Sequence, residues 1–282
     1  MTATFSFLRP KFIVTLSLVA LNQFASFTVH ADLLMTAPPR ESPKVGQAIY
    51  GPLANHLSRI LGESVYYEHP QTWQNYAKNM RNDKYDIVFD GPHFAAWRID
   101  TLAAKPIVKL PGSLSFVLIA GKNDSEVKIL KDLTGKTICT LPSPNLGALT
   151  LFSMFPNPAR QPNYQLIEEG FTAVAKAFEN HQCKAAIIRS TIYYKKLPAE
   201  FRAKTIVIKE SKVPTNQGIT VSNRIDLEHQ KLLILSLTKG EGIKATKPIL
   251  ERFSKNATAF EPAAKKDYIR LNLLKDNSIF GW

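Results

Sequence analysis

The chain has 282 residues, of which 45% are hydrophobic, and a formal net charge of +13 at pH 7. These values are typical of a globular protein with a sizeable core and leave room for two domains of ordinary size. The 36 Lys and Arg residues are scattered rather than bunched, which argues against a nucleic-acid partner and leaves a solvated basic surface or the attraction of small anions.

The N-terminus has the features of an export signal. Two basic residues precede an apolar run at 12–20, no acidic residue occurs before Asp32, and the small-residue sequence VHA occupies 29–31. These features predict a cleaved signal peptide at 1–31 and a mature chain in the periplasm. The alternative is an uncleaved anchor, although the apolar run is short for a membrane span.

The first part of the mature chain alternates short apolar strands with amphipathic helices. Strands are predicted at 33–37, 65–67, 86–89 and 107–110, with helices at 45–61, at 72–81 and from 93 onward. This order predicts a mainly parallel sheet with helices on both faces. Ligands bind such sheets at the edge where strands end and helices begin.

Two polar residues lie at that edge, within the stretch YDIVFDGPHF at 85–94. Asp90 ends the strand, a Gly-Pro pair turns the chain, and His93 opens the next helix. We therefore predict Asp90 and His93 as ligand-binding residues. The alternative is that Asp90 only caps the helix and that the Gly-Pro pair only turns the chain.

The second part of the chain repeats the alternation after a long apolar strand. Strands are predicted at 113–121, 137–141, 164–167, 185–188, 206–208 and 218–222, with helices from 146 to about 154 and at 171–180, 191–196, 227–238, 243–253 and 261–274. Two α/β units joined by long strands predict a two-lobed protein with a ligand cleft between the lobes.

The second unit has its own candidate site. Ser143 and Asn145 precede a helix, whose N-terminus has free backbone N–H groups and attracts anions. Arg189 follows a strand at the same edge and can clamp a phosphate or phosphonate with two hydrogen bonds. The alternatives are a helix cap for the loop and a surface salt bridge for Arg189.

Four aromatic residues are candidates for lining the cleft, although side chains at helical spacing also pack in cores. They are Tyr50, Trp73, Trp97 and Tyr193.

Cys139 and Cys183 are the two cysteines of the chain. Their spacing fits neither a metal site nor a redox pair, and in an oxidising compartment we predict a disulfide. Two buried free thiols are the alternative.

The sequence contains no signature of a zinc hydrolase, a serine hydrolase or a phosphate-binding glycine loop. We therefore expect a protein that is not an enzyme, with no catalytic residues, no metal and no cofactor.

Several stretches together resemble the phosphate/phosphite/phosphonate-binding proteins of ABC transporters. They are YGPLANHLSRILG at 50–62, the spaced Trp73, Tyr76 and Met80, YDIVFDGPHFAAWR at 85–98, GKTICTLPSPNLGAL at 135–149 and CKAAII at 183–188. The resemblance runs from about residue 33 to 223, and its first-lobe motifs are the more specific.

The resemblance implies a monomeric type II periplasmic binding protein, which closes two α/β lobes on its ligand and delivers the ligand to a membrane permease. It places lobe one at 32–112 plus 214–282 and lobe two at 113–213, with hinge strands between them. Carried over by position, Tyr50 and the loop from Asp90 to His93 line the cleft from lobe one. Ser143, Asn145 and the helix start at 171, including Thr172, line it from lobe two.

The implied ligand is a small oxyanion: phosphonate, phosphite or phosphate. The family often has a hydroxyl-rich loop where this chain has SPNLG at 143–147. The smaller number of hydroxyl groups, together with Arg189, favours binding of the oxyanion by charge rather than by hydroxyl donors. Two other functions stay open: a ligand sensor for another small organic solute, and a secreted α/β enzyme using the same cleft.

Overall fold

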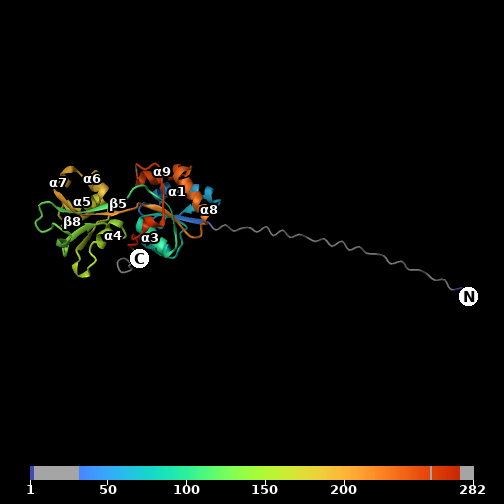
Figure 1. The fold of residues 1–282 in the computed structure, drawn as a ribbon, viewed down its shortest axis with the longest axis horizontal. Coiled ribbons are helices and arrows are strands. Elements are labelled where there is room, and N and C mark those ends of the chain that lie inside the picture. The colour runs from blue at the N-terminus through green and yellow to red at the C-terminus, as the bar shows by residue number, and fades with distance from the viewer. Residues whose placement is uncertain (3–31, 255, 274–282) are drawn as a thin grey trace. The chain divides into compact units, whose positions relative to one another are not determined.

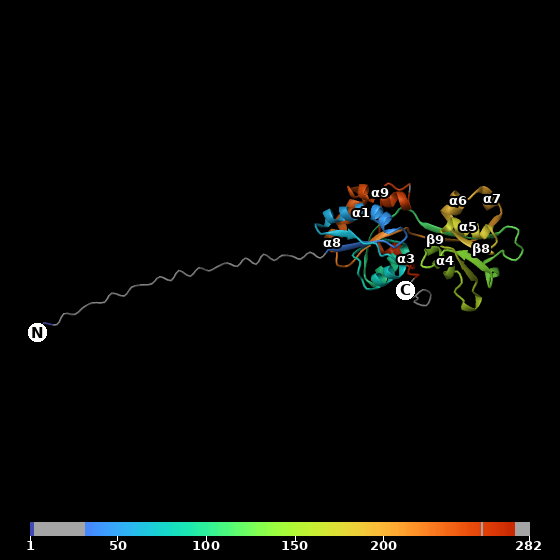
Figure 2. The same cartoon turned by 180° about the vertical axis from the view of Figure 1, so that it is seen from behind.

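The computed structural model describes residues 1–2, 32–254 and 256–273. The predicted signal peptide therefore lies outside the described residues, apart from its first two. The described chain builds two β-sheets, each with its own helices (Figures 1 and 2). Among the described residues, no helix is both long enough and apolar enough to cross a bilayer.

The first sheet has the strand order β11-β4-β10-β3-β1-β2. Its strands are β1 (Leu33–Thr36), β2 (Val65–Tyr67), β3 (Ile87–Asp90), β4 (Lys105–Lys109), β10 (Gly218–Val221) and β11 (Glu261–Pro262). β1 runs parallel to β2 and β3, whereas β10 runs antiparallel to both of its neighbours, β3 and β4. Four strands of this sheet therefore share one direction, as the alternation in the sequence predicts.

Five α-helices belong to the first sheet: α1 (Pro43–Leu61), α2 (Trp73–Arg81), α3 (Pro92–Thr101), α8 (Leu227–Lys239) and α9 (Gly242–Phe253). Local chemistry fixes their ends. Thr72 caps α2 by accepting a hydrogen bond from the backbone N–H of Asn75, and α1 ends at Gly62, whose φ of 66° favours glycine. Figure 1 shows α1, α8 and α9 on one side of this sheet, over a core that includes Leu53 and Phe89.

The second sheet has the order β7-β6-β8-β5-β9. Its strands are β5 (Leu114–Gly121), β6 (Thr137–Thr140), β7 (Asn163–Leu166), β8 (Ala185–Arg189) and β9 (Thr205–Val213), and its α-helices are α4 (Leu146–Ser153), α5 (Phe171–Glu179), α6 (Ser190–Lys195) and α7 (Ala199–Ala203). β6 is parallel to β7 and β8, and β5 is antiparallel to β8 and β9. The predicted disulfide is confirmed, with the two Cα atoms of Cys139 and Cys183 5.7 Å apart.

The predicted helix at 261–274 is wrong. Residues 261–262 instead form β11, which pairs with β4, and a short 3-10 helix follows at Lys265–Tyr268. Pairing with β4 holds residues 261–262 as a strand, and the Asp267 carboxylate accepts from the N–H of Ala264 and starts the 3-10 turn there. Strand β9 is longer than the predicted 206–208. Its outer residues alternate between buried and exposed positions, so a search for a continuous apolar run finds only part of it.

Candidate functional site

A cavity of about 140 Å³ opens where strand ends of both sheets meet. The first sheet contributes Arg40, from the loop after β1, and Gly91 and His93, from the start of α3. The second contributes Asn145, at the start of α4, and Arg189, at the end of β8. Phe171, the first residue of α5, also lines the cavity. The N-terminal ends of three helices therefore border one small space, a favourable place for an anion.

Two half-buried arginines line this cavity, and each has one guanidinium nitrogen without a hydrogen-bond partner among the described residues. Nη1 of Arg40 and Nε of Arg189 are buried and have no hydrogen-bond partner among the described residues. Burial lowers the pKa of Arg189, and the nearby charges of Arg252 and Arg40 lower it further. Arginine nevertheless stays charged at physiological pH. The cavity is therefore lined by two cations, each with a donor that has no acceptor among the described residues.

His93 is 3% exposed and links the two halves of the cavity. Its Nε2 lies 3.1 Å from the carbonyl oxygen of Pro144, and its Nδ1 is buried without a partner. Burial, helped by the charge of Arg40, lowers the pKa of His93 to about 3, against a smaller raising effect of the Pro144 carbonyl. Gly91 is required here, because a Cβ on it would come within 2.7 Å of the His93 ring.

Asp90 lies behind the cavity rather than on its wall. The side chain is fully buried and accepts a hydrogen bond from the Tyr76 hydroxyl at 2.8 Å, with Nη1 of Arg98 3.9 Å away. Burial raises the pKa of Asp90, and Arg98 and Tyr76 oppose that rise. The carboxylate therefore belongs to the support of the cavity's first-sheet wall.

An adjoining cavity of about 390 Å³ shares Arg40, Trp73, Pro144 and Asn145 with the first. It is also lined by Ser143, whose hydroxyl is buried without a partner, and by Glu168. Asn145 caps α4, because its side-chain oxygen accepts from the N–H of Gly147 at 2.8 Å.

The remaining predicted residues lie elsewhere. Tyr50 is fully buried in the core beside Tyr67, and Tyr193 is buried with its hydroxyl 2.8 Å from that of Thr205. Thr172 is exposed on α5 and lines neither cavity. The structure therefore brings together His93, Ser143, Asn145 and Arg189, with Asp90 directly behind.

Sequence reasoning missed Arg40 and Gln217. Arg40 was detectable, because it lies in the loop after the first strand, at the edge where the other candidates lie. Gln217 immediately precedes β10, and its buried side-chain oxygen has no partner among the described residues. No sequence motif contains Gln217, and it is far in sequence from the other first-sheet residues of the cavity, Arg40, Gly91 and His93.

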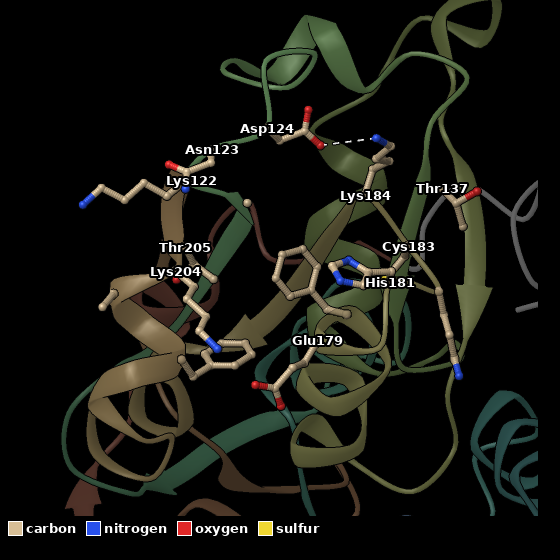
Figure 3. A pocket seen from close by; sticks show the side chains of 15 residues that line it. Lys122, Asn123, Asp124, Thr137, Glu179, His181, Cys183, Lys184, Lys204 and Thr205 are labelled. Carbon is tan, nitrogen blue, oxygen red and sulfur yellow. Dashed lines mark hydrogen bonds and ion pairs between the residues drawn. The ribbon is translucent and has the colours of Figure 1, made fainter.

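A larger cavity of about 650 Å³ lies at the other end of the second sheet, beside the disulfide (Figure 3). Its lysines and His181 are exposed to solvent, and Lys184 pairs with Asp124 at 3.4 Å. None of the predicted ligand-binding residues lines it. In the part of the chain that the structure describes, no group of three metal-ligating side chains occurs.

Comparison with solved structures shows the fold. The chain is similar to XAC2383 from Xanthomonas citri bound to ATP, with a TM-score of 0.66, 13% identity, and coverage of 85% of this chain and 94% of that one. It is also similar to PhnD1 from Prochlorococcus marinus in complex with methylphosphonate, with a TM-score of 0.58, 18% identity, and coverage of 84% and 94%. A third is the binding protein component of an ABC phosphonate transporter from Pseudomonas aeruginosa, with a TM-score of 0.55, 16% identity, and coverage of 85% and 83%.

No curated protein sequence matches the chain. The family model described as "ABC transporter, phosphonate, periplasmic substrate-binding protein" matches residues 35–268, which is most of the chain. This is a family of binding proteins rather than of enzymes. The two-sheet fold and the cavity between strand ends agree with that match, and the chain belongs to the periplasmic substrate-binding family of phosphonate ABC transporters.

Proposed function

We propose that this protein is the periplasmic solute-binding component of an ABC importer and that it binds a small phosphorus oxyanion in the 140 Å³ cavity. The observation that carries the proposal is a pair of buried guanidinium nitrogens, Nη1 of Arg40 and Nε of Arg189, that line or adjoin the cavity and have no hydrogen-bond partner among the described residues. Burying a cation without a partner costs free energy, so such groups are expected where a ligand supplies the missing charge.

The chemistry of the cavity fits a tetrahedral oxyanion. Arginine donates to phosphate and phosphonate oxygens with geometry that lysine lacks, and the three helix N-termini add positive potential. The cavity is small, so the anionic group is the part of the ligand that it holds. We keep 32–112 plus 214–282 and 113–213 as the proposed lobes, and lobe closure as the step that buries the ligand.

The adjoining cavity gives room for an organic substituent on phosphorus. Glu168 lines it and, in this proposal, contacts a cationic substituent such as an ammonium group. A phosphonate therefore fits better than bare phosphate, which would leave that space to water. The implied partner of the loaded protein is a membrane permease, and the implied compartment is the periplasm.

Thermal melting and calorimetric titration of the refolded, ligand-free protein test this proposal. The panel is phosphate, phosphite, methylphosphonate, 2-aminoethylphosphonate and sulfate. A ligand at 100 times its Kd is expected to stabilise the fold by about 2.7 kcal/mol, which is a rise of several degrees in melting temperature. No rise with any phosphorus oxyanion would contradict the proposal.

Arg189→Ala is the variant that tests the site itself. We expect it to weaken binding by roughly tenfold to hundredfold, because it removes charge-assisted hydrogen bonds to the anion. The matched control is Arg160→Ala, which removes an exposed arginine from the same sheet region, outside both cavities, and should leave affinity unchanged.

A further inference from the structure

We propose that His93 selects among oxyanions by accepting a hydrogen bond from a protonated ligand oxygen, so that the site binds singly protonated phosphorus oxyanions and rejects sulfate. This inference rests on the proposed function and assigns a specificity-determining residue within the same site. It follows from the tautomer of the imidazole, from its neutrality and from the position of its second nitrogen.

The partner of Nε2 fixes the tautomer. Nε2 lies 3.1 Å from the backbone oxygen of Pro144, and a carbonyl oxygen can only accept a hydrogen bond. Nε2 therefore has the hydrogen. In a neutral imidazole the other nitrogen, Nδ1, then has a lone pair and can only accept.

The surroundings keep the ring neutral. His93 is 3% exposed, and the lowering of its pKa to about 3 means that it does not gain a proton at neutral or mildly acidic pH. The charged groups around the cavity include Arg40 from the loop after β1, Asp90 from β3, Arg98 from α3, Arg189 from β8 and Arg252 from α9. None of them forms a hydrogen bond with Nδ1 in the described chain.

Nδ1 of His93 and the guanidinium of Arg40 lie close to the same point beside Gly91. A Cβ placed on Gly91 would lie 3.0 Å from Nδ1 of His93 and 3.7 Å from Nη2 of Arg40. One acceptor and one cation therefore flank a single spot beside Gly91. A ligand that satisfies both presents an ionised oxygen to the guanidinium and an O–H to the imidazole.

Singly protonated phosphonate, phosphite and phosphate present both kinds of oxygen. Sulfate at neutral pH is fully ionised and presents acceptors only, so its oxygen would meet the lone pair of Nδ1. Two acceptors in contact repel each other, and the hydrogen bond that a protonated ligand gives to Nδ1 is not gained, so we expect sulfate binding to be weaker by roughly tenfold to hundredfold. The same reasoning makes the dianion of a phosphonate a poor ligand, even though Arg40 and Arg189 favour negative charge.

The test is calorimetric titration of the mature, disulfide-intact protein with methylphosphonate and with sulfate at a series of pH values. For the unmodified chain we expect the methylphosphonate affinity to fall about tenfold per pH unit above the second pKa of the ligand, because the competent singly protonated form becomes scarce. We expect sulfate to bind at least tenfold more weakly than methylphosphonate.

His93→Asn places an amide at the position of Nδ1, and an amide can turn its NH₂ group toward an ionised oxygen. We expect this variant to lose the pH slope and to gain at least tenfold in sulfate affinity. His181→Asn makes the same change at an exposed histidine of the larger cavity and should alter neither.

The outcomes separate the inference from the proposed function. Methylphosphonate binding that stays constant or tightens as the pH rises, or sulfate binding as tight as methylphosphonate binding, would overturn the role of His93 and leave the binding function standing. No binding of any phosphorus oxyanion would overturn both. A missing pH slope in the unmodified chain overturns the role of His93 even if the variant does not fold.

Discussion

The smallest and the largest of the three cavities described above differ most in what their charged groups contact. The larger one, beside the disulfide, holds about 650 Å³, and its exposed charges meet water or each other, as Lys184 meets Asp124 and Glu126. The smaller one holds about 140 Å³, and its two arginines have buried donors without partners. Buried donors without partners, rather than volume, therefore distinguish the candidate ligand site from the larger cavity.

Removing both arginines of the smaller cavity is expected to have the largest effect on ligand binding. We expect Arg40→Ala combined with Arg189→Ala to abolish measurable oxyanion binding, since each charge-assisted hydrogen bond contributes about 1.5–3 kcal/mol. The empty double variant should melt close to the unmodified protein, because the loss of the Arg40 contact with Phe253 is offset by the removal of two buried nitrogens without hydrogen-bond partners. Calorimetry and thermal melting measure the two effects, and intact binding by the double variant would refute the assignment of the site.

Removing the disulfide should affect only the region of the larger cavity. Cys139 and Cys183 are 44 residues apart, and replacing both by alanine should cost about 2–4 kcal/mol of unfolding free energy. Ligand affinity should stay unchanged, because neither cysteine lines the smaller cavity. Denaturant unfolding and calorimetry test the two statements separately, and a large loss of affinity would show that the two regions are coupled.

The pH dependence of stability should differ between the buried His93 of the smaller cavity and the exposed His181 of the larger one. Between pH 6.5 and about 3 the folded state binds fewer protons than the unfolded chain, because folding lowers the pKa of His93 to about 3. The contribution of the neutral His93 to the free energy of unfolding is complete above pH 6.5 and is lost as the pH falls toward 3. Between pH 7 and pH 5 it amounts to about 2 kcal/mol.

The ligand-free His93→Gln variant should lack this part of the pH dependence, measured as the difference from the unmodified protein in denaturant unfolding at each pH. His181→Gln, at the exposed histidine, should keep it. Equal acid sensitivity of the unmodified protein and His93→Gln would mean that His93 is not held neutral by burial.

The smallest effect is expected for Lys184→Ala. This lysine pairs with Asp124 and Glu126 but is half exposed, and surface ion pairs contribute little. We expect no measurable change in melting temperature or oxyanion affinity. A loss of affinity would indicate that the larger cavity takes part in binding.

The fold was predictable because most of its strands are apolar runs between turn residues, and its longer helices are amphipathic. Two predictions failed: residues 261–262 pair with β4 where a helix was predicted, and the half-exposed β9 has no apolar run that shows its length. These are cases in which pairing with a distant strand outweighs local propensity.

The candidate site was partly predictable for a different reason. His93, Asn145 and Arg189 follow strands, so topology alone brings them to one edge. Tyr50 and Tyr193 could not be distinguished from ligand-binding aromatics, because a buried tyrosine with a satisfied hydroxyl has the same sequence pattern. The roles of all these residues in binding remain predictions for the variants above.

The position of β10 has a consequence for how the chain folds. This strand is built from residues 218–221, yet it sits between β3 and β4 in the middle of the first sheet. The strands of the second sheet, β5 to β9, are consecutive and can assemble as soon as they are available. The first sheet cannot be completed until residues 218–221 have been synthesised, because until then β3 and β4 lack the strand that lies between them. Unpaired strand edges promote aggregation, so the N-terminal part of this protein is the last to be completed and the part that most needs protection while the chain emerges.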